Sequence, residues 1–371
     1  MIKLLHSSDL SLGAKLSFAP AVGERLAVAQ MATLDRLLAQ ATNHEVDLLI
    51  FTGNLFAHHA PEATLREAVF HRLTALAPAI RIVILPGCYD HPLGADSVYR
   101  DERFQPWVVD ERGVDSQPLV FNLAAGDLFL YTLPWQCDPG NAHSYMARRS
   151  GDGVHLGAFH SLKLDQRNPF QDPLVHWKKA ILAWDLDYVV VGNRSRGTVK
   201  HGATLCADCP GTPQGLSFNE CGERCSSMVT LGGDNVELES LATESIRFEQ
   251  RELEVMMHEP AEHFHQMLDE WAQRDVALRV RLVGAIEELF DPVKVVARHQ
   301  ERFALLACDD ETRFLASETL TRLAEEETVR GILCRRFIEL AVDASESQRS
   351  VYEKALRELL HRFHAVAEDE V

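Results

Sequence analysis

The sequence predicts an α/β protein whose first strands are parallel. Three short apolar runs, at residues 2–6, 47–52 and 81–85, are rich in β-branched and aliphatic residues, which is typical of buried strands. Two longer segments, residues 21–43 and 61–76, separate the runs and have helical spacing. Strands that alternate with long helices pair in parallel, because each crossover helix returns the chain to the same end of the sheet.

A polar turn closes each of the three runs. The turns cover residues 7–13, 53–56 and 86–91. The carboxyl ends of neighbouring parallel strands meet at one edge of a sheet, and open α/β sheets place their binding sites there. We therefore expect the three turns to lie together and to form a functional site.

The rest of the chain predicts a second sheet and then a second domain. Strand-like runs follow at residues 118–123, 127–133, 154–160 and 188–192, and the first two are expected to form a hairpin. The pattern changes near residue 245. We expect a first domain over residues 1–245 and a second over 246–371, with a small α/β unit and a tail of two amphipathic helices, residues 317–340 and 345–367.

Composition is that of an ordinary globular protein with room for two cores. The chain has 371 residues, of which 46% are hydrophobic and 25% charged. No apolar run reaches the roughly 20 residues of a membrane helix, and the amino terminus lacks the pattern of a signal peptide, so we expect a cytoplasmic protein with no membrane partner.

The charge balance disfavours strong DNA binding by the chain itself. The net charge is −18, whereas affinity for DNA comes largely from neutralising phosphates. Any contact with DNA is therefore expected to depend on a partner chain. The basic stretch with Arg194, Arg196, Lys200 and His201 is either a local binding patch or a solvated loop.

The order of the turns resembles the calcineurin-like metallophosphoesterases, and most of all their DNA-repair exonuclease branch, the SbcD-like and YhaO-like proteins. That family has Asp-x-His, Gly-Asp, Gly-Asn-His-Asp, a lone His and Gly-His-x-His after successive strands. A Pro-Gly-Thr-Pro turn at residues 210–213, followed by Asn219 and Glu220, is a second similarity to this branch. The resemblance implies a two-sheet sandwich, a small capping domain and two catalytic metal ions.

Most of the family's metal ligands are replaced in this chain. Asp9 and His160 match; the other family positions carry Ser11, Asn54, Cys88, Tyr89, Asn193 and Ser195. A two-metal site needs carboxylates and imidazoles around cations about 4 Å apart. Asn54 lacks the charge of a bridging carboxylate, and the phenol of Tyr89, with a pKa of about 10, is a poor general acid at neutral pH. The sequence therefore indicates a nuclease-like protein without ordinary two-metal catalysis, in which Asp9 and His160 are residual ligands.

Two other interpretations stay open. In the first, a remodelled site binds Mn²⁺ and remains an active phosphodiesterase or exonuclease, using nearby groups: Asp9, His58, His59, Asp90, His91, His160 and His201. In the second, the chain is an interaction scaffold that does not act on DNA.

The resemblance also implies partners. Family members work with an SMC-like coiled-coil ATPase, whose base packs against the helical tail, and they form homodimers through helices of the phosphoesterase domain. The candidate dimer helices are residues 21–43 and 61–76. The alternative for the tail is an ordinary helical cap on the chain's own core.

A cysteine-rich loop at residues 206–225 predicts a structural zinc site. Cys206 and Cys209 form a C-x2-C pair, and Cys221 and Cys225 form a C-x3-C pair. Disulfides are not expected in a cytosolic protein. The alternative is a group of small buried thiols. Cys88 stands where the family has a metal-binding Asn, and it is either a redox-sensitive thiol or a neutral replacement.

Overall fold

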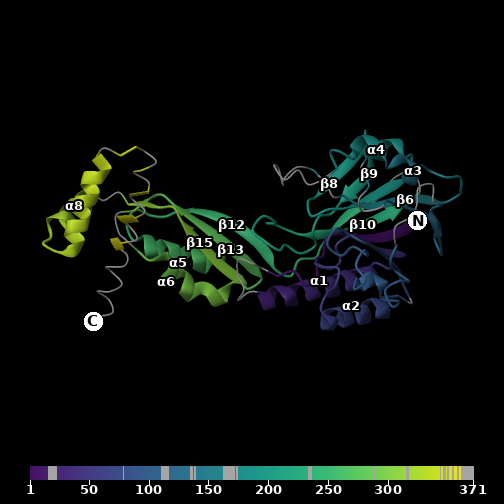
Figure 1. The fold of residues 1–371 in the computed structure, drawn as a ribbon, viewed down its shortest axis with the longest axis horizontal. Coiled ribbons are helices and arrows are strands. Elements are labelled where there is room, and N and C mark those ends of the chain that lie inside the picture. The colour runs from purple at the N-terminus through teal and green to yellow at the C-terminus, as the bar shows by residue number, and fades with distance from the viewer. Residues whose placement is uncertain are drawn as a thin grey trace. The chain divides into compact units, whose positions relative to one another are not determined.

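The computed structural model describes residues 1–15, 23–77, 79–109, 117–133, 137, 139–161, 172, 174–232, 236–286, 290–314, 317–342 and short stretches between 344 and 360. The chain is a mixed α/β protein with two compact units, Met1–Arg247 and Phe248–Val371 (Figure 1). The division lies beside the boundary expected at residue 245.

The first unit begins with a five-stranded sheet in the order β11-β10-β1-β2-β3. Its strands are β1 (Ile2–Ser7), β2 (Leu48–Thr52), β3 (Arg81–Leu85), β10 (Cys225–Leu231) and β11 (Glu237–Ala242). The predicted parallel pairing of β1, β2 and β3 is confirmed, with α1 (Gly23–Asn43) and α2 (Ala63–Leu76) as crossovers. The two residues expected to begin α1, 21 and 22, lie outside the described part.

The second sheet has six strands in the order β4-β5-β6-β7-β9-β8. They are β4 (Leu119–Leu123), β5 (Gly126–Thr132), β6 (Val154–His160), β7 (Tyr188–Gly192), β8 (Gly197–His201) and β9 (Thr204–Cys209). The predicted β4–β5 hairpin is confirmed. The interpretation of the basic stretch as a solvated loop is wrong for its second half, because residues of β8 pair antiparallel with β9 across a turn at Gly202.

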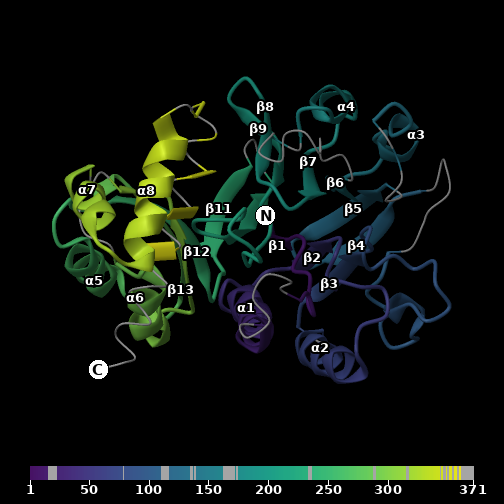
Figure 2. The ribbon, with the colours of Figure 1, turned by 60° about the vertical axis from the view of Figure 1, so that its left-hand side comes forward.

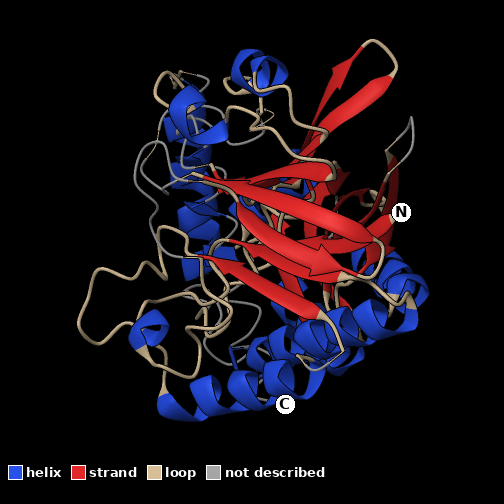
Figure 3. Ribbon diagram, turned by 90° about the vertical axis from the view of Figure 1, so that its right-hand side faces the viewer, coloured by secondary structure: helices blue, strands red, loops and turns tan. Residues whose placement is uncertain are grey.

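Four layers build the first unit, with helices outside and the two sheets inside (Figure 3). One hydrophobic cluster joins α1 and α2 to the first sheet, a second lies between the sheets, and a third joins the second sheet to α3 (His143–Met146) and α4 (Lys178–Ala183). The sheets therefore pack face to face through aliphatic side chains such as Leu4, Ile50 and Leu156.

The second unit has its own small core. A three-stranded sheet contains β12 (Arg247–Glu254), β13 (Val276–Val283) and β15 (Leu305–Asp310). The helices α5 (Pro260–Trp271) and α6 (Pro292–His299) pack on it through Phe264, Leu268 and Val295. The second unit also has a short pair, β14 (Ala285–Ile286) and β16 (Arg313–Phe314), and a 3-10 turn, η3 (Gln300–Arg302), and the first unit has a 3-10 turn, η2 (Val98–Arg100).

The tail differs from its prediction. A single helix was expected over residues 317–340, but the chain forms α7 (Ser317–Glu325) and α8 (Val329–Val342). The Thr328 hydroxyl accepts from the Gly331 amide at 3.1 Å and so begins a new helix. A Cβ on Gly331 would lie 2.1 Å from the Glu326 carbonyl oxygen, so glycine allows the chain to fold back here. Most of the second expected tail helix, residues 345–367, lies outside the described part. Among the described helices, none has the length and apolar character to cross a membrane.

Candidate functional site

The three polar turns meet at the carboxyl ends of β1, β2 and β3, as the sequence predicts. Backbone amides of the first turn donate to carbonyls of the second, from Asp9 to Gly53 at 3.1 Å and from Ser11 to Asn54 at 2.8 Å. Asp9, Ser11 and Asn54 all adopt left-handed backbone angles, with φ of 52°, 51° and 50°. Such angles cost non-glycine residues about 1–3 kcal/mol each and gather at functional sites.

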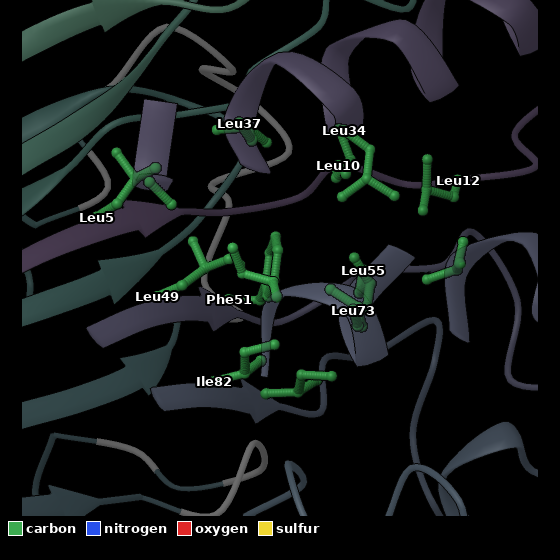
Figure 4. Close-up of a cluster of buried hydrophobic side chains, with 14 of the residues drawn as sticks. Leu5, Leu10, Leu12, Leu34, Leu37, Leu49, Phe51, Leu55, Leu73 and Ile82 are labelled. Carbon is green, nitrogen blue, oxygen red and sulfur yellow. The ribbon is translucent and has the colours of Figure 1, made fainter. Parts of the chain in front are cut away.

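Buried leucines hold the strained turns in place. Leu10, Leu12 and Leu55 alternate with the polar residues and point into the cluster beneath α1 and α2 (Figure 4). Because each turn has apolar side chains in the core, its polar side chains have little freedom to move.

Glycines let the strand ends come close together. A Cβ on Gly53 would lie 2.3 Å from His160 Cδ2, and a Cβ on Gly87 would lie 2.3 Å from Asn54 Oδ1. A Cβ on Gly192 would lie 1.7 Å from the Thr52 carbonyl oxygen. The site therefore forms where the ends of β2 and β7, from different sheets, are in direct contact.

At the centre of the site, Asp9, Asn54 and His160 contact one another directly. Asn54 Nδ2 donates to Asp9 Oδ1 at 2.8 Å, and its Oδ1 accepts from the Tyr89 amide at 2.9 Å, which orients the side-chain amide. His160 Nε2 lies 3.2 Å from Asp9 Oδ2, and the Ser8 hydroxyl donates to the same oxygen at 2.6 Å. Both carboxylate oxygens of Asp9 thus have protein donors.

Asp9 and His160 form a buried ion pair. Burial alone would lower the pKa of His160, but the Asp9 carboxylate beside it raises the pKa above the ordinary 6.5. Burial would likewise raise the pKa of Asp9, but His160, Asn54 and Ser8 together hold it below the ordinary 3.8. Each group therefore shifts the pKa of the other toward its charged form.

Asp90 fastens the turns together, a role that the sequence analysis missed. Its carboxylate accepts from the backbone amides of Gly87 at 2.7 Å, Phe56 at 3.1 Å and Asn54 at 3.2 Å. The Tyr99 hydroxyl donates to it at 2.5 Å. Burial raises the pKa of Asp90 above 3.8 despite these donors. Its position three residues after the glycine of a Pro-Gly turn was the available signal, since a short carboxylate there can accept from several turn amides.

The remaining family positions close the site from its sides. Cys88 is half-buried, 3.7 Å from Asn54 Nδ2, and burial raises the pKa of its thiol above 9.0. Tyr89 is 50% exposed. Asn193 donates from its backbone to the Ser8 hydroxyl at 2.9 Å, and its side chain accepts from the Ser195 amide at 3.0 Å. Asn193 and Ser195 thus serve as loop-forming residues in this structure.

The histidines proposed for a remodelled site lie partly together. The rings of His58 and His59 are 4.1 Å apart and those of His59 and His91 are 5.1 Å apart, while Asp96 lies 3.4 Å from His59. His201 is exposed at the end of β8. Within the described ranges, no group of three or more His, Cys, Asp or Glu side chains is arranged to hold a metal ion.

The residues at the strand ends do not fit a two-metal centre. A bridging ligand must turn a lone pair toward both cations, whereas Asn54 turns an N–H toward Asp9 at 2.8 Å. The two residual ligands, Asp9 and His160, already satisfy each other. The direct hydrogen bonds therefore take up both Asp9 oxygens and His160 Nε2, while His160 Nδ1 is buried and has no hydrogen-bond partner in the described part of the chain.

The cysteines of the predicted zinc loop form no disulfide with one another, and three of them have separate hydrogen-bond partners. Cys209 lies on β9, with its Sγ 3.1 Å from the Ser195 carbonyl oxygen, and burial raises its pKa well above 9.0. Cys206 Sγ lies 3.6 Å from the Thr204 carbonyl oxygen and Cys221 Sγ lies 3.0 Å from that of Phe218. Cys225 begins β10 in the other sheet. A structural zinc ion stays a prediction, which zinc analysis of the dialysed protein would test.

The arginines near the site are engaged within the chain. Arg194 donates through Nη2 to Glu220 at 2.6 Å, and the other oxygen of Glu220 accepts from the Leu216 amide at 2.7 Å. Arg196 Nε donates to the Pro210 carbonyl at 3.2 Å. These contacts hold the segment that contains the Pro-Gly-Thr-Pro turn against the end of β7.

Comparison with known proteins adds no relative. No protein-family model matches the chain, and no curated protein matches it significantly.

Proposed function

We propose that the chain is a catalytically silent, SbcD-like relative of the metal-dependent phosphodiesterases. The observation that carries the proposal is the Asn54 amide, which donates to Asp9 at the point where a bridging carboxylate would bind two cations. Support also comes from the left-handed backbone at Asp9, Ser11 and Asn54, because such angles are often found at functional sites and three of them meet at these strand ends.

Charge supports the same conclusion. Two divalent cations require several anionic ligands to be stable in a buried site. Asp9 is paired with the ring of His160, and Asp90 is occupied by backbone amides and Tyr99. No uncommitted carboxylate is left among the described residues at the centre of the site.

We infer a role as a subunit of a cytoplasmic DNA-processing assembly with an SMC-like coiled-coil ATPase. In support, α8 exposes apolar side chains at Val329, Ile332 and Leu340, and exposed apolar stripes on helices are a common docking surface for partner helices. The net charge of −18 favours contact with DNA through the partner chain. Self-association through α1 and α2 belongs to the same proposal.

The first experiment measures hydrolysis of bis(p-nitrophenyl) phosphate and of DNA in Mn²⁺ by the purified chain. We expect rates equal to a protein-free blank and unchanged by Asp9→Ala or His160→Ala. Mn²⁺-stimulated hydrolysis that is lost in both variants would instead support the remodelled, active site.

The second experiment tests the assembly. The chain is co-purified with the SMC-like coiled-coil ATPase of the same organism, and retention of linear DNA by the ATPase is measured with and without it. Increased retention is expected. Stable binding to the ATPase with no change in DNA retention would support the scaffold that does not act on DNA.

A further inference from the structure

A groove of about 370 Å³ opens between the edge strands of the two sheets in the first unit. Its walls come from β8, from the start of β9, from the turn between them, which lies at the top of Figure 2, and from β11. Leu205, Val236 and Leu238 line it and also pack against the cluster between the sheets. The core between the sheets therefore reaches the surface at this groove.

The outer edge of β11 carries backbone groups with no partner in the described part of the chain. Thr243 donates to the Arg224 carbonyl at 3.0 Å, and this bond fixes the alternation of the β10–β11 ladder. Backbone groups along an antiparallel strand point alternately toward and away from the neighbouring strand. Leu241 and Glu239, two and four residues before Thr243, therefore bond to β10, and the N–H and C=O groups of Ser240 and Leu238 point away from it.

Other parts of the same sheet are covered. The carbonyl of Ala242, at the end of β11, accepts from Gln40 Nε2 of α1 at 2.8 Å. At the opposite edge, Ile84 of β3 donates to Trp107 at 2.7 Å and accepts from Val109 at 2.9 Å. Proteins usually protect sheet edges, because an open edge pairs readily with another strand. The stretch around Leu238 and Ser240 has no such cover in the described part of the chain.

The side chains around the open edge alternate in character. Leu238 faces the groove, while Glu237 and Glu239 are exposed on the other face of β11. Neither carboxylate has an ion-pair partner among the described residues. Lys200 lies at the groove wall on β8. A strand added beside β11 would therefore meet a groove of mixed lining, with aliphatic side chains beside β11, on one face and two carboxylates on the other.

We propose that the edge of β11 binds an extended peptide segment of another protein, with aliphatic residues that alternate with Lys or Arg. The backbone of the peptide pairs with Leu238 and Ser240, its aliphatic side chains fill the groove, and its basic side chains face Glu237 and Glu239. The positive charge of Lys200 repels any basic side chain of the peptide that is placed in the groove. A shift of the peptide by one residue would exchange its two faces and lose both interactions.

The test titrates the full chain against a fluorescein-labelled peptide, Val-Lys-Val-Arg-Val-Lys-Val, by anisotropy. We expect saturable binding that Glu237→Lys with Glu239→Lys weakens by about tenfold or more, since attraction becomes repulsion at two cross-strand pairs. The double variant should bind a peptide with Glu in place of Lys and Arg better than the wild type does. The matched control, Glu24→Lys with Glu102→Lys, makes the same change of net charge and should leave binding unchanged.

A second variant tests the backbone pairing. Ser240→Pro removes an amide that points away from β10, so the sheet should stay intact while peptide binding is lost. Unchanged binding in both the charge-reversed and the proline variants would overturn the proposal. If the chain self-associates through this edge, with dimers lost in Ser240→Pro and no competition by the peptide, the edge belongs to a second copy and the peptide proposal fails. If the Ser240→Pro variant does not fold, the proposal is decided by how the Glu237→Lys, Glu239→Lys double variant binds the basic and the acidic peptides.

Discussion

At the scale of single residues, the Asn54 amide occupies the position that decides what the site can hold. Its Nδ2 lies 2.8 Å from Asp9 Oδ1, and the amide of Tyr89 fixes its orientation from the other side. A carboxylate at this position would face Asp9 across the same distance. Without a cation between them, two such carboxylates cannot both stay charged in a buried site.

Asn54→Asp is therefore expected to destabilise the metal-free protein at neutral pH by about 3 kcal/mol, because one of the two carboxyl groups must be protonated well above its usual pKa. Chemical denaturation in EDTA measures the change. Mn²⁺ should recover part of the loss, because the restored carboxylate is the ligand that two cations share.

The control for this substitution is Asn219→Asp, the same change at an exposed position, which should alter stability by less than about 0.5 kcal/mol. A stable Asn54→Asp variant in EDTA would mean that Asp9 and position 54 do not face each other as the structure has them.

The Asp9–His160 pair gives stability a defined pH dependence. His160 has a pKa raised above 6.5, so its contribution is complete below pH 6.5 and is lost as pH rises through the higher folded value. Asp9 has a pKa lowered below 3.8, so its contribution is complete above pH 3.8 and is lost as pH falls through the lower folded value. The difference in stability between the wild type and His160→Gln should be largest between these limits.

Urea unfolding from pH 4 to pH 9 measures this difference. His176→Gln, at an exposed histidine, provides the control and should give a difference close to zero throughout. If the difference in unfolding free energy between the wild type and His160→Gln does not decrease as the pH rises from 6.5 to 9, the ion pair is contradicted.

At the scale of secondary-structure elements, the contact between β2 and β7 determines the shape of the site. Gly192 ends β7 against the Thr52 carbonyl, and a Cβ there would overlap it at 1.7 Å. The two sheets cannot separate locally without disturbing His160, whose Cδ2 would lie 2.8 Å from the same Cβ.

Gly192→Ala is expected to cost about 3 kcal/mol in unfolding free energy, because a buried backbone must shift to admit the methyl group. Gly23→Ala is the matched control, since nothing lies within 4 Å of a Cβ at that position. Thermal denaturation compares the two variants. Equal melting temperatures would show that the sheets are not in contact at Gly192.

The sequence predicts the strands and helices of the first unit well where the apolar pattern is strong. Runs such as residues 188–192 allow only a buried strand, and β7 occupies those residues. The polar strands were missed. Residues of β8 and β12 have exposed faces and carry Lys200, Arg251 or Glu254, so their pairing depends on neighbours that no local pattern reveals.

At the scale of the whole molecule, the sequence predicts which residues gather at the site but not how they interact. The order of the turns placed Asp9, Asn54 and His160 at one edge of the sheets. Their direct hydrogen bonds depend on side-chain orientation, and the role of Asp90 depends on amides from two separate turns. The predicted zinc loop and the nuclease-like role in DNA processing stay predictions.

The net charge of −18 leads to an expectation for the isolated chain. Without a basic partner it should not be retained on DNA at physiological salt, because its 37 Lys and Arg residues are outnumbered by 55 Asp and Glu residues, which repel phosphates. A DNA-retention assay at two salt concentrations checks this, and salt-sensitive binding by the chain alone would contradict it.

The central claim is that direct hydrogen bonds have replaced metal ions at the strand ends. Mn²⁺ binding by calorimetry, with Asp9→Ala and His160→Ala as reference variants, tests it most directly. The account predicts that the wild type binds no more Mn²⁺ than the Asp9→Ala and His160→Ala variants do. Two Mn²⁺ ions per chain, both lost on Asp9→Ala, would contradict it.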